Sequence, residues 1–94
     1  MEPSEEILNQ IQEYASYFLT WQQIAVLVNI PEKDFKEEME NNKSEVYRRY
    51  TKGKTLSTLE INKNLVRLAK IGSPQAEILV KDDINKQQLA ENDL

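Results

Sequence analysis

Apolar residues recur every three or four positions along most of the chain, which is the spacing that lines one face of an α-helix. At the first such run, Ser4 stands before Glu5 and Glu6. This order is typical of a helix start, because the hydroxyl caps the backbone and the helix dipole favours acids in the first turn. The pattern predicts a first helix over about residues 4–18. Its apolar face is formed by Ile7, Leu8, Ile11, Tyr14, Ala15 and Phe18.

Capping residues divide the following stretch into two short helices. Thr20 can cap a second helix over residues 21–28, and Asn29 can end it because asparagine tolerates a left-handed backbone. Pro31 suits the first turn of a third helix, in which Phe35 faces inward. A helix, a sharp turn and another helix are therefore expected in close succession.

Small and capping residues also divide the middle of the chain. Ser44 is expected to start a fourth helix that ends near Gly53, since glycine is common just past a helix end. Thr55 or Ser57 would then open a long fifth helix, and Gly72 would stop it.

Ser73 and Pro74 open a sixth predicted helix over residues 73–88, with a polar tail expected to fray after about Lys86. No stretch alternates apolar and polar residues as a strand does. A length of 94 residues fits one domain. The expected fold is all-α: a single helical domain over residues 1–94, with about five to six helices that include a helix-turn-helix.

Residues 19–40, LTWQQIAVLVNIPEKDFKEEME, have the spacing of that helix-turn-helix. Ala25 is small where the two helices would cross closely, and Asn29 lies four residues on, at the sharp turn. Ile30 follows as a buried turn residue, and Phe35 anchors the second helix. The expected core of this unit is Ile24, Ala25, Val28, Asn29, Ile30 and Phe35.

The second helix of this unit is acidic. Residues 32–40 carry five acids against two lysines. Carboxylates beside phosphates repel, and affinity for DNA depends on neutralising phosphate charge. The composition therefore favours a structural role for this helix over the reading of DNA bases.

The net charge of −4 is distributed unevenly along the chain. Residues 1–42 carry two lysines against nine acids, residues 43–70 eight bases against two acids, and residues 71–94 two lysines against five acids. The basic block indicates a phosphate-binding surface, although a merely solvated face has the same composition. The candidate DNA-binding residues are Arg48, Arg49, Lys52, Lys54, Lys63, Arg67 and Lys70. Tyr47 and Tyr50 are candidates for stacking on bases or, next to Val46, for the core.

The composition excludes several kinds of chemistry. The chain has no cysteine and no histidine, so disulfides, the usual zinc sites and histidine-activated nucleophiles are not expected. Adjacent acids such as Glu37 and Glu38, or Asp82 and Asp83, point in different directions on a helix. We expect neither an enzyme nor a cofactor or metal site. An acidic, polar start and the lack of a long apolar run predict a soluble, cytoplasmic protein with no membrane partner.

The predicted fifth helix has two apolar sides. Leu59 and Val66 project from one side, whereas Ile61, Leu65 and Leu68 project from another. Such a helix is either enclosed by its own domain or shared with a partner chain. The small size of the domain favours sharing, and we expect a homo-oligomer.

Two short motifs follow the helix-turn-helix in the sequence: Tyr-x-Lys-Gly-Lys at residues 50–54 and Leu-Ala-Lys-x-Gly-Ser-Pro-Gln-Ala at residues 68–76. Following the helix-turn-helix, they make residues 15–85 resemble the small terminase subunits of phages and prophages. The resemblance implies a protein that binds double-stranded viral DNA as an oligomer, in the host cytoplasm if phage-encoded. It also implies regulation of a large terminase subunit that holds the ATPase and nuclease.

Two other functions fit the same sequence features. A small helix-turn-helix transcriptional regulator would form a two-fold dimer on a short palindrome. A protein-interaction adaptor would dock a basic partner on its acidic helices and would not respond to DNA. Our leading interpretation is the DNA-binding packaging accessory.

Overall fold

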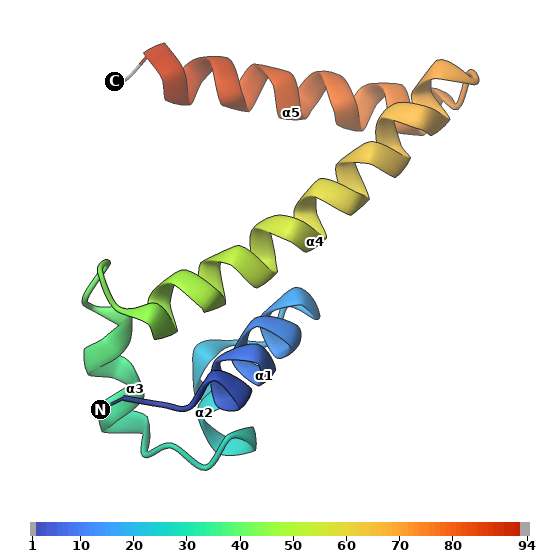
Figure 1. The fold of residues 1–94 in the computed structure, drawn as a ribbon. Coiled ribbons are helices and arrows are strands. Elements are labelled where there is room, and N and C mark those ends of the chain that lie inside the picture. The colour runs from blue at the N-terminus through green and yellow to red at the C-terminus, as the bar shows by residue number, and fades with distance from the viewer. Residues whose placement is uncertain (1, 93–94) are drawn as a thin grey trace. The chain divides into compact units, whose positions relative to one another are not determined.

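The computed structural model describes the backbone of residues 2–92, and this range contains five α-helices and no strand (Figure 1). The all-α prediction is confirmed. The helices are α1 (Glu5–Ser16), α2 (Trp21–Leu27), α3 (Glu32–Met39), α4 (Glu45–Lys70) and α5 (Pro74–Asn92). One domain was expected over residues 1–94, but the contacts group into two compact units that divide between Thr58 and Leu59, within α4.

The helix starts predicted from capping residues are confirmed in the first unit. Ser4 Oγ accepts a hydrogen bond from the Ile7 backbone N–H at 3.2 Å. Thr20 Oγ1 accepts one from the Gln23 N–H at 3.2 Å, while the Gln23 side chain accepts the Thr20 N–H at 3.0 Å. This reciprocal capping box satisfies two backbone donors that the first turn of α2 cannot pair internally.

The ends of α1 and α2 are closed by residues in the left-handed conformation. Asn29, with φ of 58°, closes α2, and the Ile30 N–H donates to the Ala25 carbonyl at 3.0 Å. Such a bond back across the last turn is typical of a left-handed helix cap. Phe18 was expected within the first helix, but it lies beyond the end of α1 with φ of 63° and is 49% exposed. Pro31 is the residue before α3 rather than its first helical residue.

The hydrophobic core lies in the first unit. Phe35, Ile11, Ile24 and Val46 are fully buried there. The Trp21 ring stacks on that of Phe35 with 6.0 Å between centroids. Burial of apolar surface is the main term that favours folding, so this cluster holds α1, α2, α3 and the start of α4 together. The remaining buried apolar members are Leu8, Ala15, Ala25, Val28 and Tyr50.

The fourth and fifth predicted helices are one continuous helix, α4, so the break expected at Gly53 was wrong. A Cβ atom at Gly53 would lie 2.9 Å from the Ala15 Cβ and closer still to the Gln12 carbonyl oxygen. The glycine therefore serves close packing of α4 on α1, although it lowers helix propensity. The Thr55 hydroxyl donates to the Thr51 carbonyl at 2.8 Å within α4 and caps no new helix.

Arg49 joins α4 to α1 beside this contact. Its guanidinium donates to the Glu5 carboxylate at 3.0 Å and to the Asn9 side-chain oxygen. The Arg49 side chain is 19% exposed, and its Nε is buried without a hydrogen-bond partner in the structure. Arg49 thus contributes to the fold of the first unit.

In the second unit the end of α4 and α5 form a hairpin. Gly72 has φ of 95°, and the Ser73 N–H donates to the Leu68 carbonyl at 3.1 Å, as in the left-handed cap of α2. This confirms the predicted stop at Gly72. Helix α5 continues to Asn92, so the end expected near residue 88 was wrong. No helix within residues 2–92 is long and apolar enough to cross a membrane.

Replacing Gly53 with alanine should destabilise the protein, even though alanine favours helix by about 1 kcal/mol. The added methyl group meets a backbone carbonyl that cannot rotate away, and overpacking of this kind costs about 1–3 kcal/mol. Chemical denaturation followed by Trp21 fluorescence measures the effect. Thr51→Ala, at an exposed position of the same helix, is the control and should not lower stability. A Gly53→Ala protein more stable than wild type would disprove the close approach.

Replacing Arg49 with alanine should lower the free energy of unfolding by about 1–2 kcal/mol. The substitution removes the hydrogen bonds of a mostly buried guanidinium. The expected loss of stability is kept small because Glu5, the charged partner, is largely exposed to water. The neighbouring Arg48→Ala is the matched control, and its expected effect is below about 0.5 kcal/mol, because Arg48 has only an exposed pair with Glu45 at 3.6 Å. Equal effects of the two substitutions in the same denaturation experiment would contradict this role of Arg49.

Candidate nucleic-acid interface

The seven predicted DNA-binding residues all lie on α4, and the boundary between the two units separates them into two groups. Each group is described within its own unit. The first unit holds Arg48, Arg49, Lys52 and Lys54, and the second holds Lys63, Arg67 and Lys70.

Arg48 and Lys52 are the accessible members of the first group. Four residues apart on one helix, they lie one turn from each other on the same side of α4. Both are exposed. Arg48 lies 3.6 Å from the Glu45 carboxylate, but a pair this exposed contributes little energy and yields readily to a phosphate. Together they offer two cationic groups to one strand of a nucleic-acid backbone.

Arg49 and Lys54 are engaged within the protein. Arg49 is bound to Glu5 and Asn9, as described above. The Lys54 ammonium lies 4.6 Å from the centroid of the Tyr50 ring, in a cation–π contact. Tyr50 is itself buried, and it therefore belongs to the core rather than to a base-stacking surface. The sequence contains no signal for the Glu5–Arg49 pair, because 44 positions separate the two residues.

The second group forms an exposed stripe near the end of α4. Lys63, Arg67 and Lys70 are all exposed, and Lys63 lies 3.5 Å from the Glu60 carboxylate. The three side chains also border a shallow groove of about 540 Å³. The groove is completed by Leu59, Asn62, Val66 and Ile71. These cations therefore border an apolar surface.

The predicted helix-turn-helix residues are placed as follows. Ile24, Ala25, Val28 and Phe35 are buried, Ile30 is partly buried, and Asn29 is exposed at the turn. Whether α2 and α3 work together as a DNA-reading unit stays a prediction.

The surface of α3 and of its C-cap residue, Glu40, carries more acids than bases. Glu32, Glu37 and Glu40 are exposed there and Asp34 is partly buried, against the exposed Lys33 and Lys36. Glu38 is partly buried, and its carboxylate accepts a hydrogen bond from the Ser44 hydroxyl, which ties α3 to the start of α4. These groups give α3 a surface that repels phosphate.

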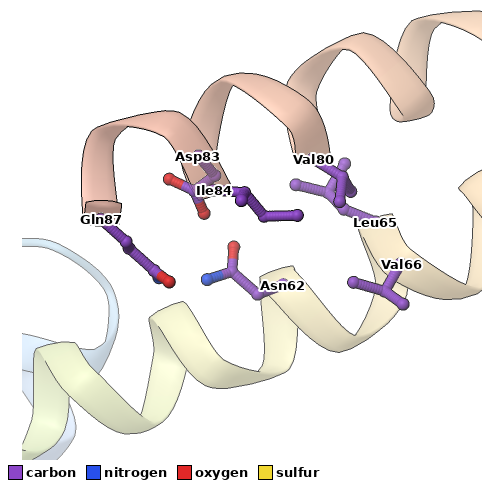
Figure 2. Close-up of a pocket in the computed structure, with 7 residues that line it drawn as sticks. All are labelled: Asn62, Leu65, Val66, Val80, Asp83, Ile84 and Gln87. Atoms are coloured by element: carbon purple, nitrogen blue, oxygen red, sulfur yellow. The ribbon is translucent and has the colours of Figure 1, made fainter. Parts of the chain in front are cut away.

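A pocket of about 210 Å³ lies within the second unit, between the end of α4 and α5 (Figure 2). Figure 2 shows Asn62, Asp83 and Gln87 toward one end of it, with apolar side chains beyond them. The lining contains one titratable group, Asp83, and no nucleophile with a base beside it. Within residues 2–92 no three acidic side chains gather closely enough to hold a metal ion. The complete lining is Asn62, Leu65, Val66, Val80, Asp83, Ile84 and Gln87.

Comparison of the chain with protein-family models, with curated protein sequences and with solved structures gives no match. The resemblance to small terminase subunits therefore depends on the short motifs of the sequence alone.

Proposed function

We propose that the protein binds double-stranded DNA through the basic side chains of α4, as a non-catalytic accessory of DNA packaging similar to a small terminase subunit. The observation that carries the proposal is the charge of α4, whose 26 residues include seven bases and two acids in a chain of net charge −4. Arg48 and Lys52, both exposed and one turn apart, are the pair that we propose for phosphate contact in the first unit. In this proposal the protein acts as a homo-oligomer in the host cytoplasm. It works together with a large subunit that supplies the ATPase and nuclease.

The acidic surface of α3 supports this choice over a transcriptional regulator. A regulator of the helix-turn-helix type would place α3 in the major groove, between two phosphate backbones. The exposed acids of α3 oppose that placement, whereas no acid other than Glu45 lies within one turn of Arg48 on α4. A protein-interaction adaptor remains the alternative that does not involve DNA.

Binding of a fluorescent DNA duplex, measured by anisotropy across a salt series, tests the proposal. Each phosphate contact contributes about −0.9 to the slope of log K against log salt. Changing Arg48 and Lys52 together to glutamate should weaken binding at least about tenfold and make the slope shallower by about 2.

The matched control changes Lys33 and Lys36 of α3 to glutamate, which alters the net charge by the same amount. We expect this variant to bind within about threefold of wild type, because only long-range repulsion is added. Loss of binding in the α3 variant alone would move the interface to the helix-turn-helix. No binding of the wild-type protein at low salt would overturn the DNA function and favour the adaptor.

A further inference from the structure

A threonine shares the exposed side of α4 with the two cations proposed for phosphate contact. Arg48, Thr51 and Lys52 stand at positions i, i+3 and i+4, which are neighbours on the surface of a helix. All three residues are exposed. Val46 and Tyr50 are buried and face the core from the opposite side of α4. Thr51 therefore lies beside both members of the pair, on the side that a ligand can reach.

The hydroxyl groups of Thr51 and Thr55 differ in what they bond. A threonine side chain has one donor, its hydroxyl proton. The Thr55 hydroxyl donates to the Thr51 backbone carbonyl at 2.8 Å, so its proton is used within the helix. Among the described residues, no group accepts a hydrogen bond from the Thr51 hydroxyl. Thr51 therefore presents an open donor on the surface of α4, and Thr55 does not.

The stability of α4 gives no reason for a threonine at position 51. Threonine is a poor helix former, because branching at Cβ restricts its side chain against the preceding turn. The Thr51 side chain is exposed, so it contributes no buried surface to the core. It also makes no hydrogen bond within the helix, unlike Thr55. A ligand outside the helix is left as the partner for the Thr51 hydroxyl.

A hydroxyl donor beside two cations suits the phosphate backbone of DNA. A large share of the hydrogen bonds between proteins and DNA goes to phosphate oxygens, and threonine hydroxyls donate to them as arginine and lysine do. An uncharged donor neutralises no phosphate, however, so it releases no counterion from the DNA. A hydroxyl contact and a cationic contact to the same strand are therefore distinguishable by how each depends on salt.

We propose that Thr51 is a third ligand of the DNA backbone and donates its hydroxyl hydrogen bond to a phosphate oxygen. This inference rests on the proposed function and adds an uncharged ligand to its site. A threonine side chain is shorter than that of arginine or lysine, so the contact requires the surface of α4 to lie directly against one strand. The longer side chains of Arg48 and Lys52 then reach neighbouring phosphates of the same strand.

Replacing Thr51 with valine in the full chain tests the contact, because valine is also branched at Cβ and lacks the hydroxyl. Binding of a fluorescent duplex is measured by anisotropy across a salt series. We expect Thr51→Val to bind about threefold to tenfold more weakly than wild type, which is the usual contribution of one hydrogen bond. The slope of log K against log salt should stay at the wild-type value, because no counterion release is lost.

Two further variants provide the comparison. Thr55→Val makes the same chemical change one turn along α4, at a hydroxyl whose proton is already bonded, and should bind within about twofold of wild type. Lys52→Gln removes a charged contact and should make the salt slope shallower by about 1. Fluorescence of Trp21, the only tryptophan, should show that all three variants are folded under the conditions of the binding experiment.

The outcomes separate this inference from the proposed function. A Thr51→Val protein that binds like wild type, or equal weakening by the two valine substitutions, would overturn Thr51 as a ligand and leave the DNA function in place. Weakening of Thr51→Val with a shallower salt slope would also overturn it, because the loss would then lie in the charged contacts. Wild-type protein that binds no duplex at low salt would overturn the proposed function, and this inference with it.

Discussion

The close approach of α1 to α4 at Gly53 is the contact on which the first unit depends. Without a side chain at Gly53, the backbone of α4 packs directly against Gln12 and Ala15. Ala15 and Tyr50 are buried in the same cluster. The approach also sets which cations are accessible: Arg49 turns toward Glu5 and Asn9, and Arg48 and Lys52 are left exposed. The packing of α4 on α1 at Gly53 thereby determines which basic side chains of the first unit are free to contact a phosphate.

The two units differ in how much apolar surface they bury. Among residues 2–91, whose burial the structure describes, the first unit holds nine of the ten buried apolar side chains, and Ala76 is the single one in the second. The exposed cations therefore fall into two chemical settings. Arg48 and Lys52 lie on a helix surface open to water, whereas Lys63 and Lys70 border apolar residues. Phosphate contact suits the first setting, and helix packing suits the second.

Much of the fold was predictable from the sequence because its signals are local. Ser4, Thr20, Asn29 and Gly72 act within one helical turn, and the structure bears out each of them as a cap. Gly53 was misread because a glycine required by a tertiary contact looks the same in sequence as one that ends a helix. Phe18 was misread because its apolar character fits the stripe of α1, although its left-handed backbone ends that helix.

Less of the candidate site was predictable. The concentration of bases on α4 is visible in the sequence, and so are the two apolar sides of its later part. The engagement of Arg49 is not, because its partners Glu5 and Asn9 are distant in the sequence. Lys54 follows Tyr50 by four residues, so their contact is local, but the helix end expected near Gly53 placed the two residues on different elements. The sequence also contains no direct sign that Lys63 and Lys70 border a groove. The acidic surface of α3 was predictable, since its composition alone sets its charge.

In the proposed function, DNA meets the first unit on the exposed side of α4 and not on α3. Chemical-shift mapping of the full chain with a short duplex tests this most directly. We predict that the side-chain and amide signals of Arg48 and Lys52 shift as duplex is added, while the amide signals of Lys33 and Lys36 on α3 stay in place. Shifts confined to α3, or no shifts at low salt, would contradict the claim.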